Sequence, residues 1–423
     1  MKEKRVLQNL HRSILRSNKL KADALAFLED VKALPDKAAV QKQTLARKKR
    51  ILEILGGTEK DWSNWQWQIK NRIKDSAVLA AILGLSDLDR KRIDKVSLHY
   101  RWAISPYYLS LVAADYEDNP IYRQAVPDIG ELAPGGSLDP MNEAQTSPAP
   151  CVTRRYPDRM IINVTNQCAM YCRHCQRRRN IGEIDRHARL EDIKVALDYV
   201  AKNEEIRDVL ITGGDALLLS NQMLNFILAE LHKIPHVEIK RIGTRTPVTM
   251  PQRITPEIID IIHRYPPVFI NTQFNHPLEV TSEAKLACDR LIEAGAVLGN
   301  QAVLLRGIND KPFIMRKLNQ ELLKIRVRPY YIFHAKNVQG TGHFQTSINQ
   351  GMEIMESLRG HTSGLAIPTY IVNAPGGFGK IPVMPNYLMK MQKDKIVLRT
   401  WEGRISELDN QPQLYTEESD LEV

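Results

Sequence analysis

The amino-acid sequence predicts an α/β protein in which a helical region precedes an open sheet of parallel strands. Three observations support this fold class. Apolar residues recur at every third and fourth position before residue 100, short β-branched runs follow residue 153 at intervals of about thirty residues, and helical patterns separate these runs. Strands and helices that alternate in this way form βαβ units and a parallel sheet. Six such units are too few to close an eight-stranded barrel, so they predict an open, partial barrel or a doubly wound sheet.

The predicted elements fall into four segments. Residues 1–125 form the helical region, which includes the patterns LKADALAFLEDVKAL, KKRILEILGG and WSNWQWQIKNRIKD. Residues 126–152 are rich in Pro and Gly and predict a linker or an extended arm. Residues 153–365 form the partial barrel, and residues 366–423 carry one more strand, a Gly-rich loop and an acidic tail. The six barrel strands are expected at MIINVT (160–165), DVLITG (208–213), IKRIGT (239–244), PVFINTQF (267–274), VLGNQAVLL (297–305) and RPYYIF (328–333).

Composition argues against several classes of protein. The chain has 423 residues and a formal net charge of +10, but 49 acidic residues are interspersed with the basic ones, and no nucleic-acid-binding signature is present. No apolar segment near the N-terminus is typical of a signal peptide, and no apolar run is long enough to cross a membrane. Five cysteines do not form a disulfide framework. We therefore expect a cytoplasmic protein that binds small anionic ligands rather than nucleic acid or a membrane.

Three of the five cysteines lie within eight residues, in the sequence Cys-Ala-Met-Tyr-Cys-Arg-His-Cys of residues 168–175. A structural zinc site normally has four protein ligands, so it would need His174 or a remote residue as well. A four-iron, four-sulfur cluster suits three thiolates better, because its fourth iron then stays open for a small ligand. Cys168, Cys172 and Cys175 are therefore the candidate cluster ligands, in a loop that directly follows the first barrel strand.

A second candidate site is Lys380, in the sequence Ala-Pro-Gly-Gly-Phe-Gly-Lys-Ile-Pro. A phosphate-binding P-loop would need Gly in place of Ala374 and Ser or Thr in place of Ile381, so that interpretation fails at two positions. A lysine on a glycine-rich loop suits a covalent bond to an aldehyde, and pyridoxal 5′-phosphate (PLP) is the obvious candidate.

The C-x3-C-x2-C spacing resembles the signature of radical S-adenosylmethionine (SAM) enzymes, in which SAM chelates the open iron. From about residue 60 to residue 403, the chain resembles the lysine 2,3-aminomutase family in particular. The resemblance implies a partial (β/α)6 barrel, a [4Fe-4S] cluster, SAM, PLP on Lys380, and migration of an α-amino group to the β-carbon. The motifs that carry it are RRYPDR (154–159), CRHCQRRR (172–179), LITGGDALL (210–218), RIGTRTPV (241–248), NQAVLLRGIND (300–310), IRVRPYYI (325–332), LRGHTSG (358–364) and APGGFGKIPVMPNY (374–387).

The same resemblance implies roles for single residues. Arg177 is expected to bind the α-carboxylate of the substrate, because guanidinium groups suit oxyanions through forked hydrogen bonds. The turn Thr212-Gly213-Gly214-Asp215 looks like the family's turn for the methionine amino group of SAM, with glycines that allow close approach and an acid that matches the ammonium. The remaining expectations are His174 and Gln301 for the adenosyl part of SAM, and Arg155, Arg159 and Arg245 for the PLP phosphate.

Two departures from the family pattern concern the substrate. Where lysine mutases of this family have two aspartates for the distal ammonium, this chain has Lys336 and Asn373. Two unit charges about 4 Å apart interact by roughly 4 kcal/mol at an effective dielectric near 20, so the change disfavours lysine and favours a distal carboxylate. The glutamate 2,3-aminomutase branch shows the same substitutions. We therefore expect conversion of L-glutamate to β-glutamate through a 5′-deoxyadenosyl radical, with aspartate as a weaker rival.

Alternatives from other classes stay open at this point. They are a lysine 2,3-aminomutase that acts on free or protein-bound lysine, and a non-catalytic iron–sulfur or zinc-binding module. A structural zinc in the family's usual form is not expected, because Cys288 matches its first ligand but no cysteine follows Lys380. Cys151 has no assigned role. The resemblance also implies an electron donor of unknown identity and a homo-oligomer.

Overall fold

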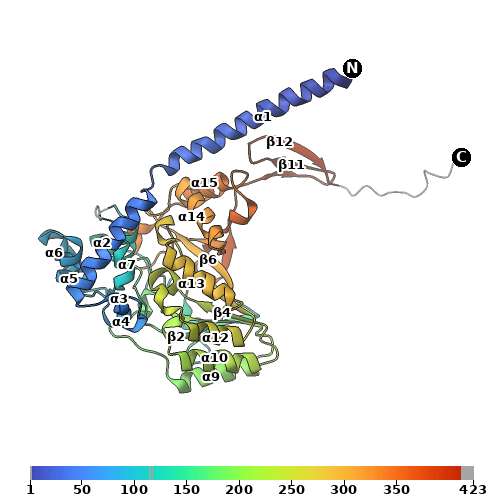
Figure 1. Cartoon of the computed structure of the whole chain (residues 1–423). Helices are drawn as coiled ribbons and strands as arrows, with labels where there is room; N and C mark the ends of the chain where they lie inside the picture. The colour runs from blue at the N-terminus through green and yellow to red at the C-terminus, as the bar shows by residue number, and fades with distance from the viewer. Residues whose placement is uncertain (1, 114–115, 117, 411–423) are drawn as a thin grey trace.

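The computed structural model describes residues 2–113, 116 and 118–410, and it confirms an α/β fold built on an open, barrel-like sheet (Figure 1). Strands β1 to β9 follow their sequence order in this sheet, and β2 to β8 are parallel. The edge strands β1 and β9 pair antiparallel with β2 and β8. The bounds are β1 Val152–Thr153, β2 Arg159–Thr165, β3 Asp208–Gly213, β4 Ile239–Gly243, β5 Val268–Thr272, β6 Val297–Leu304, β7 Arg328–His334, β8 Thr369–Asn373 and β9 Lys380–Pro382.

The six predicted barrel strands are all present, but the described part of the sheet has a seventh parallel strand. This strand, β8, pairs with β7 and lies beyond the boundary expected at residue 365. Its sequence TYIVN carries the same β-branched signal as the others, and helix α15 precedes it, so it completes another βα unit. The sheet therefore continues into the segment that carries Lys380, and β9 begins at that residue.

Amphipathic helices cover the outer face of the sheet (Figure 1). In α12, for example, the spacing of Ile258, Ile261 and Ile262 places all three on one buried face. Ser and Thr residues cap the N-termini of several of these helices. In α10, for example, the Ser220 hydroxyl accepts a hydrogen bond from the backbone of Met223. These helices are α9 Leu190–Lys202, α10 Asn221–Lys233, α12 Pro256–Arg264, α13 Ser282–Glu293, α14 Pro312–Lys324 and α15 Ile348–Leu358. The four-residue helix α11 Thr246–Thr249 is entirely buried after β4.

The N-terminal region is helical, as predicted, and shares a hydrophobic core with the barrel. Ile51, Trp62 and Ile104 belong to the same buried cluster as Ile162 and Ile211 of the sheet. The helices are α1 Lys2–Val31, α2 Lys37–Leu55, α3 Glu59–Trp62, α4 Trp65–Lys70, α5 Ser76–Leu83, α6 Asp87–Ser97, α7 Pro106–Ser110 and α8 Pro120–Ala125. Because the core is continuous, the region can position parts of the barrel.

Helix α1 projects from the body beside a small antiparallel sheet near the C-terminus (Figure 1). That sheet consists of β10 Leu388–Met391, β11 Lys395–Arg399 and β12 Ile405–Asp409. Arg16 of α1 pairs with Glu402, and its guanidinium lies 5.9 Å from the ring centroid of Trp401. Residues 411–423 of the expected acidic tail lie outside the described residues. None of the helices in the described residues has the length and apolar character needed to span a membrane.

Residues 126–152, expected as a linker or arm, pack closely against the barrel. They contain two short 3₁₀ helices, η1 Ile129–Leu132 and η2 Glu143–Thr146. Backbone hydrogen bonds join Ser137 to Asn337 and Gln339. Glu131 is fully buried, where its carboxylate pairs with Arg173 and Arg178 of the cysteine loop. Because Glu131 pairs with these arginines, its charge can lie inside the protein, although the segment around it has no hydrophobic period.

We predict that Glu131→Gln lowers the free energy of unfolding by about 3–5 kcal/mol, because it leaves two buried guanidinium groups without their carboxylate. Burial alone would raise the pKa of Glu131, but the arginines outweigh it and the pKa is lowered. Chemical denaturation followed by circular dichroism measures the change. Glu205→Gln, which breaks a surface pair with Arg154, is the matched control and should have little effect. Equal stability of the two variants would contradict the prediction.

Candidate active site

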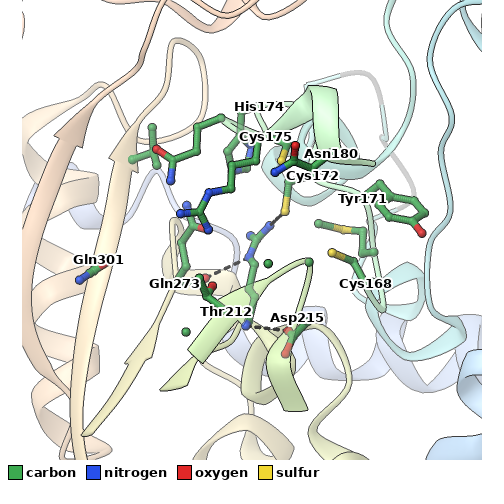
Figure 2. Close-up of a pocket in the computed structure, with 18 of the residues that line it drawn as sticks. Cys168, Tyr171, Cys172, His174, Cys175, Asn180, Thr212, Asp215, Gln273 and Gln301 are labelled. Atoms are coloured by element: carbon green, nitrogen blue, oxygen red, sulfur yellow. Dashed lines mark hydrogen bonds between the residues drawn. The ribbon is translucent and has the colours of Figure 1, made fainter. Parts of the chain in front are cut away.

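The three clustered cysteines line a cavity of about 250 Å³ at the carboxyl ends of the barrel strands (Figure 2). Cys168, Cys172 and Cys175 lie in the loop after β2, as predicted. The turn after β3, the segment after β4 and the end of β7 complete the cavity. Other expected site residues that line it are His174, Arg177, Thr212, Gly213, Gly214, Asp215, Gln301 and Lys336.

The thiols are withdrawn from solvent. Burial raises the pKa of Cys168 well above its usual value, and the charges of Asp215 and the other two cysteines raise it further. Burial likewise raises the pKa of Cys175 to about 11. Burial thus disfavours the thiolate forms of Cys168 and Cys175, which a bound metal would favour.

The N-terminal region holds the cysteine loop in place. Arg72 donates to the carbonyl of Cys168 at 2.6 Å, and the backbone of Tyr171 donates to Ala103 at 3.0 Å. The Tyr171 ring is buried and packs with Cys168 and Cys175, and its hydroxyl donates to Asp185. These contacts fix the backbone of the loop.

The glycines of the turn after β3 are required by contacts within the protein. A Cβ atom at Gly213, whose φ is +134°, would lie 2.3 Å from the carbonyl oxygen of Thr165. A Cβ atom at Gly214 would lie 2.4 Å from the carbonyl oxygen of Gln167. The turn therefore packs directly on the backbone that leads into Cys168, and larger residues would displace the cysteine loop.

Asp215 differs from the expectation that its carboxylate meets an ammonium group. The carboxylate is buried and accepts hydrogen bonds from Thr244 Oγ1 and from the backbone of Leu217 and Arg245. Burial raises its pKa, an effect that these hydrogen bonds oppose. Asp215 therefore ties the turn after β3 to the end of β4, and this structure gives it an internal partner at each oxygen.

His174 and Gln301 both face the cavity (Figure 2). His174 is buried, and its Nε2 lies 3.3 Å from Asn275 Nδ2. Its Nδ1 is buried without a hydrogen-bond partner among the described residues. Burial, with Arg245 nearby, holds the pKa of His174 well below its usual range, so the ring is neutral. A buried polar atom without a partner fits a ligand that would complete its hydrogen bonding.

Arg245, expected at the PLP phosphate, lies beside the thiols in this structure. Its Nη1 donates to Cys172 Sγ at 2.8 Å, and Nη2 donates to Glu279 and Gln124 at 2.6 Å. Its Nε donates to the carbonyl of Gln273 at 3.0 Å. The guanidinium is thus engaged at the cysteine loop rather than free for a phosphate near Lys380.

Lys380 lies among other arginines and two aromatic rings. Burial and the charges of Arg241, Arg159 and Arg155 lower the pKa of Lys380 to about 8. Its Nζ is 5.0 Å from the ring centroid of Tyr331 and 5.6 Å from that of Phe333. Arg155 Nη1 is buried without a hydrogen-bond partner among the described residues. Arg241 also donates from its Nε to Asp208 at 2.7 Å.

Lys336 and Arg177 adjoin this basic group. Burial and the charges of Arg155 and Arg177 lower the pKa of Lys336 to about 7, although Glu143 opposes this. The Glu143 carboxylate lies 3.4 Å from Arg177 and 3.5 Å from Arg155. Lys336 also donates to Gln176. Arg179 also pairs with Glu143, so four basic side chains share one buried carboxylate, an arrangement that suits anionic ligands.

Asn373 faces Lys380 across the β8–β9 pair, where the two residues are Cα partners. Its Nδ2 is buried without a hydrogen-bond partner in the part of the chain that the structure describes. The amide therefore has a donor to offer a ligand beside Lys380.

Comparison with known proteins identifies the family. Residues 162–315 match a family model described as the radical SAM superfamily, and residues 355–422 match one described as lysine-2,3-aminomutase. A protein named glutamate 2,3-aminomutase from Clostridioides difficile (strain 630) is 54% identical over 95% of this chain and 95% of its own. The chain belongs to the lysine 2,3-aminomutase family of radical SAM enzymes. Proteins named L-lysine 2,3-aminomutase are 48% identical in Clostridium subterminale (82% of this chain, 84% of that one) and 45% in Bacillus subtilis (strain 168; 82% and 74%).

Membership of this family makes the chain an isomerase and implies a [4Fe-4S] cluster and SAM. The side chains that line the cavity suit these groups, because three cysteines can bind a cluster and polar side chains around them can bind SAM.

Several residues of this aminomutase site were missed by sequence analysis. Glu143 lies in the segment expected as a linker, where no periodic pattern marks it as buried. Arg241 could have been found from the sequence. It lies inside β4, two residues before Gly243, and Gly243 lines the cavity. The period of two along a strand would have assigned Arg241 to the inner face.

We predict that Gly213→Ala impairs assembly of the iron–sulfur cluster, because its Cβ would displace the backbone before Cys168. Gly295→Ala is the matched control, since Gly295 also has a positive φ, +85°, but no atom within 4 Å of the added Cβ. Both variants have the backbone strain of a positive φ, of order 1–2 kcal/mol, but the clash is specific to Gly213. Iron and sulfide content after anaerobic reconstitution is the measurement. Equal loading of both variants would refute the argument.

Proposed function

We propose that this enzyme is a PLP-dependent aminomutase that moves the α-amino group of L-glutamate to the β-carbon, giving β-glutamate. The observation that carries the proposal is Lys336, which lies beside Arg155 and Arg177 where a lysine mutase would hold an ammonium group. The relative named glutamate 2,3-aminomutase, which matches nearly the whole chain, supports the same substrate.

The cysteine side of the cavity would hold the cluster and SAM. We assign Cys168, Cys172 and Cys175 as the cluster ligands, and His174 and Gln301 as contacts for the adenosyl group. Thr212, Gly213 and Gly214 would offer their backbone and hydroxyl groups to the methionine part of SAM. Asp215 would position this turn instead of binding the ammonium itself, because its oxygens have partners within the protein.

The Lys380 side of the site would hold PLP. Lys380 would carry the cofactor, and a pKa near 8 keeps a useful fraction of its amine neutral at cellular pH. Arg155, Arg159 and Arg241 supply the positive charge that a phosphate group requires. Arg159 has a guanidinium 4.2 Å from the Tyr156 ring centroid, which restricts it to this side of the site.

The substrate would lie between these two sides. Arg177 would bind the α-carboxylate, and Lys336 with Asn373 would bind the distal carboxylate. The free donor of Asn373 and the charge of Lys336 match a carboxylate, whereas the ammonium of lysine would meet repulsion from three cations. Aspartate has the same charge, but its distal carboxylate lies one methylene closer to the reacting carbons.

When bound, the cluster and SAM supply a 5′-deoxyadenosyl radical that exchanges a hydrogen atom with the substrate, and PLP supplies a π-system for the migrating nitrogen. The residues of the chain would orient the two carboxylates of the substrate beside Lys380. Such positioning brings the reacting atoms together and excludes stray hydrogen donors.

We also propose that copies of this chain associate through helix α1 and the small sheet that contains β10. Helix α1 exposes apolar side chains that include Leu7, Leu10 and Ile14, and the neighbouring β10 exposes Leu388 and Met391. Contiguous apolar surface of this kind is typical of protein interfaces.

The proposed function is tested by an anaerobic assay with reconstituted cluster, PLP, SAM and a reductant. Glutamate, aspartate and lysine are offered separately, and the β-amino acids are resolved by NMR or chromatography. β-Glutamate as the dominant product is the expected result. β-Lysine as the dominant product would overturn the substrate assignment while leaving the aminomutase assignment intact.

We predict that Lys336→Asp lowers kcat/KM for glutamate by at least about a hundredfold, because a carboxylate would then face the distal carboxylate of the substrate. The double variant Lys336→Asp/Asn373→Asp should gain activity on lysine. Lys233→Asp is the control, since Lys233 lies on the outer helix α10. Unchanged activity of Lys336→Asp would show that Lys336 does not contact the substrate.

We also predict that the KM for glutamate rises above about pH 7 through the loss of the charge on Lys336. Because the pKa of Lys336 in the empty site is about 7, the group is charged below that pH and must take up a proton on binding above it. The affinity should then fall by up to about tenfold per pH unit until the pKa of the complex is reached.

The variant Lys336→Arg provides the control for this pH dependence, because arginine stays charged over the whole range. The ratio of the two KM values, measured from about pH 6 to about pH 9, removes effects of other titrating groups. A ratio that does not change with pH would contradict the prediction.

A further inference from the structure

Arg245 makes a side-chain contact that the proposed reaction does not use. Its Nη1 donates a hydrogen bond to Cys172 Sγ at 2.8 Å (Figure 2). The residue is 8% exposed, so the charge acts with little screening by water. Cys175 differs from Cys172, because it accepts a hydrogen bond from the neutral backbone of Arg177 and not from a charged side chain.

A rigid set of buried groups holds this guanidinium. Glu279 is fully buried and accepts from Arg245 Nη2, from the hydroxyl of Tyr108 at 2.7 Å and from Gln124 Nε2 at 3.1 Å. Arg245 Nη2 also donates to Gln124 Oε1 at 2.6 Å. The contacts join the N-terminal region to the barrel and leave the guanidinium no room to turn away from Cys172.

We propose that Arg245 is a positioning residue that holds its positive charge and an N–H donor against the Cys172 thiolate and thereby raises the reduction potential of the cluster. Reduction adds negative charge to a cluster and its thiolates, so a nearby fixed cation stabilises the reduced form more than the oxidised form. Hydrogen bonds to the sulfur ligands act in the same direction. Glu279 offsets part of the charge of Arg245, so the pair sets the size of the effect.

This inference rests on the proposed cluster ligands but not on the substrate. Its readout is the potential of the cluster in the absence of SAM, PLP and amino acid, measured on the full chain by redox titration followed by EPR. If the wild-type protein binds no four-iron cluster, the proposed function itself fails. If the cluster forms, the inference is tested separately.

The central variant is Arg245→Gln, which removes the charge and shortens the donor. At a fixed potential, the ratio of reduced to oxidised cluster should fall at least tenfold relative to wild type, a shift of 59 mV for a one-electron couple. Arg245→Lys, which keeps the charge but not the forked donor, should fall between the two.

Arg253→Gln is the matched control for the loss of a buried arginine. Arg253 is also fully buried, but its guanidinium donates to the carbonyls of Leu217 and Leu219 and not to a thiol. It should leave the potential unchanged. If Arg253→Gln shifted the reduction potential as much as Arg245→Gln, the shift would reflect a general disturbance of the fold, and the inference would be overturned.

Glu279→Gln provides a test of opposite sign. It removes the negative charge next to Arg245 and keeps a side chain of the same size, so the ratio of reduced to oxidised cluster should rise above that of wild type. If Arg245→Gln fails to bind a cluster, this variant decides the question alone. A fall or no change in the ratio would overturn the inference.

Discussion

The contact between the cysteine loop and the segments around it is the constraint on which the rest of the site depends. A loop that holds three cysteines and four arginines cannot fold against a hydrophobic core without carboxylates to receive its charge. Glu131 meets Arg173 and Arg178 from one side, and Glu143 meets Arg177 and Arg179 from another. From the barrel, Gly213 and Gly214 let the turn after β3 approach the loop backbone. These contacts come from residues 126–152 and from the barrel, so the cysteine loop takes its position only when both parts are folded.

This arrangement gives residues 126–152 and the N-terminal helices a role in the chemistry. Arg72 and Ala103 bind the backbone of the cysteine loop, while Tyr108 and Gln124 bind the Glu279 carboxylate that holds Arg245. The barrel and its loops therefore line the cavity, and the segments before the barrel hold that lining in place. The continuous hydrophobic core between the two parts is consistent with this division.

The fold was largely predictable because each barrel strand is a β-branched run bounded by helical patterns, and such local signals do not depend on distant residues. The cysteine loop and Lys380 were predictable from motif spacing. Glu131 and Glu143 were not, because Arg173, Arg177 and Arg178 are more than thirty residues away from them in sequence and the segment around them has no period. The contact of Arg245 with Cys172 was not predictable for a related reason. Arg241 lies inside β4 and Arg245 beyond its end, and only the strand boundary separates a side chain that faces Lys380 from one that faces Cys172.

The site extends along the inside of the open barrel rather than lying at one edge of the sheet. The cysteines, His174 and Lys336 follow the carboxyl ends of their strands, whereas Arg159 begins β2 and Arg241 lies inside β4. Positive charge accumulates along this length, and the empty protein tolerates it because the pKa values of Lys336 and Lys380 fall to about 7 and about 8. Each anionic group that binds there restores the charged form of a neighbouring lysine. The basic residues at the two ends therefore reinforce each other once ligands are present, although they repel each other in their absence.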